Sequence, residues 1–557
     1  MSEPLQHPIP RLADLSLEQK VGQVIMGGFA DPVADSATLA AVADGSLGNV
    51  ILFARNCPDA ETVASLTRAL QGAAPIPLLI AADQEGGLVT RLNVGATLTP
   101  GAMALGATGD TALAEQVAAM MADELRGVGI NACLAPVADV NANPANPVIG
   151  VRSFGEDPDQ VARFVAATTR GLQHQGVAAC AKHFPGHGDT GVDSHLALPR
   201  IDRSLDDLER VDLVPFRAAI ASGVRLVMTT HIQFPALDPD RPSTLSRAIL
   251  TGLLRERLGF QGVVITDSME MRGITQDRTP AEACLAAFAA GADIVCPSHE
   301  RTDQAGAYAL ILAAVREGRV PLARLDEAVA RVLALKQWLL SQGSLRADAA
   351  AFARLDTPGH HEVAAIAAGR AITLVRHEGP WPPSLAGRVA VVEFGQPRFT
   401  GAEEGQGRLG ALAWRLAAAL GQRAEVRSVV AGVTPGEEEA ALCLAAAQAA
   451  DSLVVGTRSA TLYAAQAEVV KQLLAVGKPT VVIALRTPYD LAAFPEAATY
   501  LATYGDAMPS LAAVAAALVG TEMPPGALPV TIPGLYPRGF SIHHHQVSSS
   551  DEELRRL

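Results

Sequence analysis

Short apolar runs rich in β-branched residues alternate with longer helical segments between about residues 20 and 300. Eight such runs are present, at 21–29, 49–56, 77–87, 130–140, 177–188, 224–234, 262–271 and 292–298. Segments with the apolar spacing of amphipathic helices lie between most of them, at 111–126, 159–175, 205–222 and 278–290. Strands that are apolar throughout and separated by helices are typical of a parallel sheet covered by helices. The alternation therefore predicts an α/β fold.

Polar residues stand at the ends of most of these runs. They are Asp83, Asp139, Lys182, His183, His231 and Asp267. In a (β/α)8 barrel the carboxyl ends of all strands converge on one site, whereas an open doubly wound sheet concentrates such residues at one switch point. The spread of polar residues over many strands favours an N-terminal (β/α)8 TIM-like barrel over the open sheet.

A second folded unit is expected after the barrel. The chain has 557 residues, and a single hydrophobic core rarely grows beyond ~300 residues. We expect the barrel to cover 1–345, a polar linker 346–375 and a smaller αβα sandwich 376–557. The last of these ranges contains a new series of apolar runs, at 388–395, 451–459, 479–491 and 498–505.

Composition argues against several classes of protein. Asp and Glu number 58 against 44 Lys and Arg, and an acidic chain repels phosphate backbones, so no nucleic-acid partner is expected. The N-terminus lacks the apolar core of a secretory signal, and no apolar run approaches the ~20 residues of a membrane span. The six cysteines are scattered without a CxxC pair, as expected in a reducing compartment. We therefore expect a cytoplasmic protein without a membrane partner.

The segment from Lys182 to His195 is the richest in titratable groups. Its fourteen residues hold three histidines, two aspartates and a lysine, and Pro185 with three glycines excludes a regular helix. Histidine and aspartate bind zinc or iron, but no HxH or HExxH pattern is present. In the alternative chemistry, Asp193 orients His195 for proton transfer to and from oxygen. The density of titratable groups favours proton transfer, and neither a metal nor another cofactor is expected.

Three further motifs place charged residues in or after apolar runs. In ITDSMEM, Asp267 is either a nucleophile aimed into the barrel mouth or the N-cap of a following helix. In DQEGGLVTR, Asp83 and Arg91 either contact a polar substrate or form a structural ion pair. Arg152 in RSFGEDP likewise either contacts the substrate or holds a loop in place.

The motifs DQEGGxVxR, RSFGEDP, KHFPGHGDTxxDSH and ITDSMEM occur in this order. Together they resemble glycoside hydrolase family 3, specifically its β-N-acetylglucosaminidase branch, which acts on peptidoglycan fragments. The second half of the chain is similar to the αβα sandwich of two-domain members. The resemblance implies that Asp267 is the nucleophile and His195 the general acid/base, with Asp193 as its partner. It further implies a set of sugar-binding residues, namely Asp83, Arg91, Arg152, Lys182 and His183.

The resemblance predicts a retaining exo-glycosidase that releases terminal β-linked N-acetylglucosamine (GlcNAc) through a glycosyl-aspartate intermediate, with a GlcNAc-containing glycan or muropeptide as its partner. Retaining enzymes ordinarily use two carboxyl groups. Imidazole acting as a base carries no negative charge and does not repel phosphate, so a β-N-acetylglucosaminide phosphorylase is an alternative. A non-catalytic sugar-binding protein and a metal hydrolase are the others. The leaving sugar, the oligomeric state and the purpose of the sandwich are left open.

Overall fold

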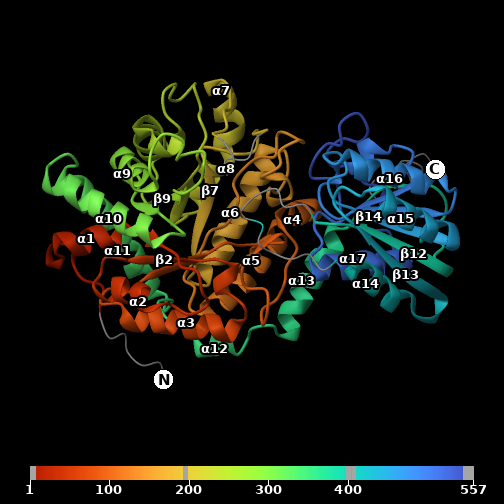
Figure 1. Cartoon of the computed structure of the whole chain (residues 1–557), viewed down its shortest axis with the longest axis horizontal. Coiled ribbons are helices and arrows are strands. Elements are labelled where there is room, and N and C mark those ends of the chain that lie inside the picture. Colours follow the sequence, from red (N-terminus) through yellow and green to blue (C-terminus); the bar gives the residue numbers. More distant parts are fainter. Residues whose placement is uncertain (1–7, 192–197, 397–402, 404–408, 544–557) are drawn as a thin grey trace, which may run out of the picture.

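The computed structural model describes residues 8–191, 198–396, 403 and 409–543. Figure 1 shows two units side by side, a larger one coloured red to green and a smaller one coloured teal to blue. The larger unit is built on one parallel sheet. Its strands are β1 (Met26–Gly27), β2 (Asn49–Leu52), β3 (Leu79–Ala82), β6 (Ala132–Cys133), β7 (Ala178–Phe184), β8 (Leu226–Thr229), β9 (Val263–Ser268) and β10 (Ile294–Cys296), paired in that order.

The first and last strands of this sheet meet, because Ile25 next to β1 forms a parallel bridge with Val295 in β10. Successive residues of one strand alternate between two cores, as period-2 geometry requires. Leu79 and Ala81 belong to the cluster inside the barrel, whereas Ile80 and Ala82 pack outward toward the helices. Both faces are therefore apolar, which explains the continuous apolar runs. The predicted (β/α)8 TIM-like barrel is confirmed.

Helices surround the barrel. They are α1 (Leu17–Gln23), α2 (Ser36–Ala43), α3 (Ala60–Ala73), α4 (Ala102–Thr108), α5 (Thr111–Gly127), α6 (Pro158–His174), α7 (Leu205–Asp207), α8 (Leu213–Ala221), α9 (Pro280–Ala290), α10 (Arg301–Arg316) and α11 (Leu322–Ser341). Two π-helical stretches, Leu208–Asp212 and Ala248–Arg257, interrupt the pattern. Several helices begin at a side-chain cap; for example, the Asp157 carboxylate accepts the Gln160 N–H at the start of α6. A short hairpin of β4 (Gln84–Gly86) and β5 (Val89–Thr90) follows β3.

The smaller unit is a six-stranded sheet. Its strands are β11 (Thr373–His377), β12 (Gly387–Phe394), β13 (Ala424–Ala431), β14 (Ser452–Thr457), β15 (Thr480–Ala484) and β16 (Thr499–Ala502), in the order β11-β16-β15-β14-β12-β13. Only β11 is antiparallel to its neighbour among these described strands. One face packs on α14 (Ala411–Leu420) and α17 (Met508–Val519), and the other on α15 (Glu437–Ala449) and α16 (Ala464–Ala475). The predicted αβα sandwich is confirmed.

The two units are joined by helices and by a common apolar core. Residues 346–375 contain α12 (Ala349–Phe352) and α13 (Pro358–Ala371), and α13 contacts both α4 and α17. Met103 and Val151 of the barrel belong to the same apolar cluster as Tyr489 and Val530 of the sandwich. Within the described residues, no helix combines the length and the apolarity that crossing a lipid bilayer requires.

Candidate active site

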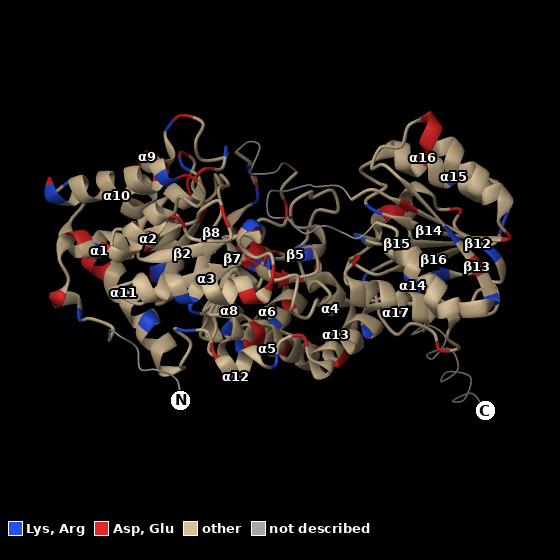
Figure 2. Cartoon of the chain, turned by 60° about the horizontal axis from the view of Figure 1, so that its bottom comes forward, with Lys and Arg blue, Asp and Glu red and all other residues tan. Residues whose placement is uncertain are grey.

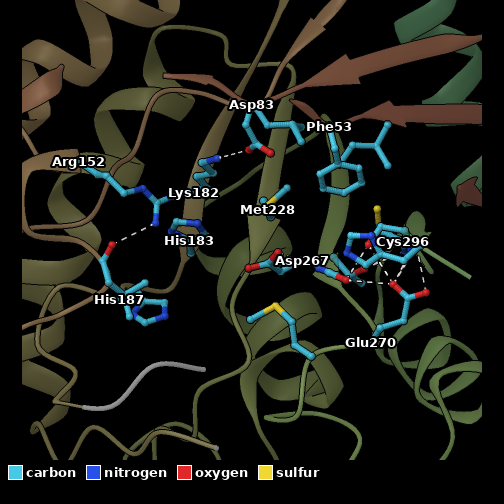
Figure 3. A pocket seen from close by; sticks show the side chains of 18 of the residues that line it. Phe53, Asp83, Arg152, Lys182, His183, His187, Met228, Asp267, Glu270 and Cys296 are labelled. Atoms are coloured by element: carbon cyan, nitrogen blue, oxygen red, sulfur yellow. Dashed lines mark hydrogen bonds and ion pairs between the residues drawn. The ribbon is translucent and has the colours of Figure 1, made fainter. Parts of the chain in front are cut away.

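A cavity of about 360 Å³ opens at the carboxyl ends of the barrel strands. Six residues predicted from the sequence line it, namely Asp83, Arg91, Arg152, Lys182, His183 and Asp267. Figure 3 shows Asp267 between the side of the cavity that carries Lys182 and His183 and the side that carries Glu270. The other two predicted residues, Asp193 and His195, lie outside the described residues.

A buried network of charges forms one wall of the cavity. Lys182 Nζ lies 2.6 Å from Asp83 Oδ1 and 2.7 Å from Glu85 Oε1. Arg152 binds Glu85 with two nitrogens, at 2.8 and 2.9 Å, and Arg91 lies 3.1 Å from Asp83. Figure 2 shows acidic and basic residues side by side around β5 and β7. Three cations thus surround two carboxylates. Asp83 and Arg91 form an ion pair, and both residues also line the cavity.

Electrostatics keeps this network ionised. Burial alone would raise the pKa of Asp83 and Glu85, but the neighbouring cations outweigh burial and hold both pKa values below their usual range. Burial likewise opposes the charge on Lys182, yet the two carboxylates raise its pKa above the usual value. The wall therefore presents rigid charged donors and acceptors, which suit the recognition of several hydroxyl groups at once.

Asp139, at the end of the short β6 region, holds the two described histidines of the His-rich motif. Its Oδ2 lies 2.7 Å from His183 Nδ1, and its Oδ1 accepts the backbone N–H groups of His183 and His187 at 3.2 and 2.7 Å. The carboxylate is fully buried. It fixes the plane of the His183 ring at the edge of the cavity, leaving Nε2 as the ring nitrogen that Asp139 does not engage.

His187 is held neutral rather than charged. Burial, aided by the neighbouring His183, lowers the pKa of His187 to about 4. Its Nδ1 lies 2.9 Å from Thr190 Oγ1, and Asn146 Nδ2 donates to its backbone carbonyl at 2.9 Å. His187 therefore acts as a structural part of the cavity wall around neutral pH.

Asp267 is the next-to-last residue of β9 and lines the cavity. Its Oδ1 accepts the Ser268 N–H at 2.7 Å. The next described helix, α9, begins more than ten residues later and is capped by Thr279, so the helix-cap interpretation of Asp267 is not supported. Buried His231 supports this strand end, since its Nε2 lies 2.8 Å from the Ser268 carbonyl oxygen. A carboxylate on a rigid strand end, open to a cavity, is suited to nucleophilic attack on a bound substrate.

Sequence reasoning did not single out two carboxylates. Glu85 lies inside the DQEGG motif and joins Lys182 to Arg152. Glu270 lies inside ITDSMEM, and it accepts the backbone N–H groups of Ser298, His299 and Glu300 at 2.8–3.0 Å. It thereby ties the chain after β9 to the chain after β10. The sequence signal that could have identified both glutamates is their position inside the DQEGG and ITDSMEM motifs.

An aromatic pair at the cavity was also not predicted. The rings of Phe53 and His299 are stacked with centroids 4.7 Å apart, and both line the cavity. Phe53 follows β2 and His299 follows β10, so only the closure of the barrel brings them together. Among the described residues, no three His, Cys, Asp or Glu side chains gather as a metal site would require.

Comparison with known proteins gives the following matches. Residues 16–335 match the family described as glycosyl hydrolase family 3 N terminal domain. A β-N-acetylglucosaminidase/β-glucosidase of Cellulomonas fimi is 33% identical over 544 residues, covering 93% of this chain and 94% of that protein. β-Hexosaminidase A of Pseudoalteromonas piscicida is 41% identical over 365 residues, which is 60% of each chain, so the chain spans less than two thirds of that relative.

Among solved structures, a glycoside hydrolase family 3 β-N-acetylglucosaminidase from Paenibacillus sp. str. FPU-7 superposes with a TM-score of 0.89. It is 39% identical in sequence, and the match covers 93% of this chain and 99% of that chain. The similarity therefore includes both the barrel and the sandwich.

Proposed function

This chain belongs to glycosyl hydrolase family 3, a family of glycoside hydrolases, and from that premise we propose that it is a retaining exo-β-N-acetylglucosaminidase. The observation that carries the proposal is the placement of Asp267. It lies near the carboxyl end of β9 and lines the same cavity as Asp83, Lys182 and Arg152 of the buried network. This shared cavity supports the proposal that Asp267 is the nucleophile and that the charged wall binds the sugar hydroxyl groups.

In the proposed reaction, the non-reducing GlcNAc lies against the charged wall, and Asp83, Arg152, Lys182 and His183 bind its hydroxyl groups. An Asp267 carboxylate oxygen attacks the anomeric carbon and forms a glycosyl-aspartate ester. The bond to the leaving oxygen breaks, and His195, oriented by Asp193, gives that oxygen a proton.

In the second half of the reaction, His195 takes a proton from water. The water oxygen then displaces Asp267 from the anomeric carbon, so the released sugar keeps the β configuration. The roles of Asp193 and His195 rest on the KHFPGHGDTxxDSH motif in the sequence.

The leaving group is proposed to be a peptidoglycan fragment. Support for this proposal comes from the four motifs, which resemble the β-N-acetylglucosaminidase branch that acts on peptidoglycan fragments. We expect faster cleavage of GlcNAc-anhydro-muramic acid than of chitobiose when kcat/KM is compared at equal ionic strength. Equal or reversed values of kcat/KM would contradict the peptidoglycan assignment alone.

The nucleophile is tested with Asp267→Ala and 4-nitrophenyl β-GlcNAc as substrate. We expect turnover to fall by about 10⁴-fold or more, because the covalent route is lost. Added azide should then restore nitrophenol release and give the α-glycosyl azide, since azide attacks from the face that the carboxylate has left. Asp277→Asn removes a carboxylate that is 71% exposed, and it serves as the control that keeps wild-type activity.

Two results would overturn these assignments. Substantial turnover by Asp267→Ala without azide would exclude it as the nucleophile. Formation of GlcNAc 1-phosphate by the wild-type protein in phosphate buffer would replace hydrolysis with phosphorolysis, because a neutral imidazole does not repel an anionic acceptor.

A further inference from the structure

We propose that Tyr489 of the sandwich is a positioning residue for the sugar-binding wall, acting through residues 139–157, here called the bridging segment. This segment runs from the end of the β6 region to the first residues before α6. One side of it supports the active site and the other side is bound by the sandwich. The inference concerns substrate binding and therefore rests on the proposed function.

The inner side of the bridging segment holds active-site groups in place. Asp139 binds the ring and the backbone of His183, and Asn146 donates to the carbonyl of His187. Arg152 forms the two-nitrogen contact with Glu85, and Glu85 in turn binds Lys182. The position of this one segment therefore sets the positions of His183, Arg152 and, through Glu85, Lys182.

The outer side of the bridging segment contacts the sandwich at three points. Asn141 Nδ2 donates to Tyr489 Oη at 2.8 Å, and both residues are at most 3% exposed. The Glu156 carboxylate accepts the Thr531 N–H at 2.9 Å and the Thr531 hydroxyl at 2.6 Å. Val151 packs in the apolar cluster that also contains Tyr489.

The two sides are mechanically coupled over very short stretches of chain. Asn141 is two residues from Asp139, and Val151 directly precedes Arg152. Ser153 Oγ ties the segment to itself, because it contacts the carbonyl oxygen of Asp139 at 2.7 Å and that of Gly155 at 2.9 Å. A shift at Asn141 or Val151 is therefore passed to Asp139 and Arg152 with little room for relaxation in the densely packed interior.

Tyr489 is the key contact because its hydrogen bond is buried. Removing one partner of a buried hydrogen bond leaves the other unsatisfied, and Asn141 Oδ1 already lacks a hydrogen-bond partner within the described part of the chain. Without the tyrosine hydroxyl, the Asn141 side chain regains a hydrogen bond only by turning toward other polar groups. That turn moves the bridging segment. Binding groups must be held to within about half an ångström to work well.

The test compares Tyr489→Phe with Tyr504→Phe. Tyr504 is a matched control, since it is 1% exposed and its Oη lies 2.7 Å from Thr373 Oγ1 within the sandwich, away from the bridging segment. We expect Tyr489→Phe to raise KM for 4-nitrophenyl β-GlcNAc roughly fivefold, while kcat changes by less than about twofold. For Tyr504→Phe we expect both KM and kcat to stay within about twofold of wild type.

Hydrogen exchange supplies a readout that does not depend on turnover. We expect the backbone amides of residues 139–157 to exchange faster in Tyr489→Phe than in wild type, and to be unchanged in Tyr504→Phe. Thr531→Val removes one hydrogen bond to Glu156 at a less buried site, and it replaces Tyr489→Phe if that variant does not fold. It should change KM and exchange in the same direction by a smaller amount.

Failure of the inference and failure of the proposed function are distinguishable. If wild type does not cleave the substrate, the proposed function fails, and exchange together with calorimetric GlcNAc affinity still tests the coupling. Unchanged KM and unchanged exchange in Tyr489→Phe would overturn the inference. An equal rise in KM for both tyrosine variants would also overturn it, because the effect would then be a general loss of stability.

Discussion

Two buried lysines lie at opposite ends of the barrel, and their surroundings differ. Lys182, at the carboxyl end, contacts Asp83 and Glu85, and these carboxylates raise its pKa. Lys336, in α11, lies at the amino end, where Nζ contacts only neutral oxygens in the described structure, Gln23 Oε1 at 2.6 Å and the Gly48 carbonyl at 2.8 Å. Burial lowers the pKa of Lys336 to about 7.

The two lysines indicate that the carboxyl end of the barrel serves activity and that the amino end serves stability. The charges at the carboxyl end are costly to bury, yet they are paired with one another and open onto a cavity. At the amino end Lys336 joins the residues before β1 and β2 to α11, and among the described residues its Nζ contacts no carboxylate. Barrels of this type carry their chemistry at the carboxyl end and use the amino end for stability. The comparison therefore predicts different consequences when each lysine is removed.

The largest difference is expected from Lys182→Met compared with Lys336→Met. Lys182→Met removes the ammonium group that pairs with the buried negative charges of Asp83 and Glu85. We therefore expect kcat/KM for 4-nitrophenyl β-GlcNAc to fall by roughly 100-fold or more. Unfolding free energy should fall by about 3–5 kcal/mol. Lys336→Met is expected to keep kcat/KM within about twofold in the same assay. Equal losses of activity in the two variants would contradict the division between the two ends.

The second difference concerns stability at alkaline pH. The folded pKa of Lys336, about 7, lies below the usual value of 10.5, so the unfolded chain binds more protons between these values. Wild-type stability relative to Lys336→Met should therefore rise with pH across this window, by about 3–5 kcal/mol in total. Urea unfolding of both proteins between pH 6.5 and 10.5 measures the difference. A constant difference across that range would mean that Lys336 keeps its charge when folded.

The smallest effect is expected from His187, and it sharpens the comparison. His187 lies at the carboxyl end, where its Nδ1 lies 2.9 Å from Thr190 Oγ1, and burial, aided by the neighbouring His183, lowers its pKa to about 4. The unfolded chain binds more protons between pH 4 and about 6.5, so this neutral histidine contributes stability above that window and loses it as pH falls through it.

His187→Gln removes this titration while keeping a polar side chain. Wild-type stability relative to the variant should fall by about 2–3 kcal/mol between pH 6.5 and 4, measured by chemical unfolding. The opposite slope would contradict the prediction, because it would show that His187 is charged in the folded protein.

Several features of the fold and the site were predictable from local sequence patterns. The alternation of apolar runs with amphipathic segments predicted the barrel and the sandwich, because a strand buried on both faces is apolar throughout, whereas a helix buried on one face is apolar at every third or fourth residue. The four motifs predicted the family. Six of the eight proposed site residues line one cavity, Asp193 and His195 lie outside the described residues, and the catalytic or binding roles of all eight stay predictions.

Other features join residues that are far apart in the chain, and no local pattern contains them. Lys182 and Asp83 are 99 positions apart, Lys336 and Gln23 are 313 apart, and Asn141 and Tyr489 are 348 apart. Residues 346–375, expected as a polar linker, carry two helices, one of which packs between the barrel and the sandwich.

The sequence by itself determined which elements form and which residues are capable of chemistry, since periodicity and short motifs act over a few residues. Only the tertiary structure decided which charge faces which. The pKa of a lysine depends on whether carboxylates or neutral carbonyls surround it after burial, and those neighbours come from other strands. For the same reason, only the folded chain shows that the sandwich contacts the outer side of the bridging segment, which carries Arg152.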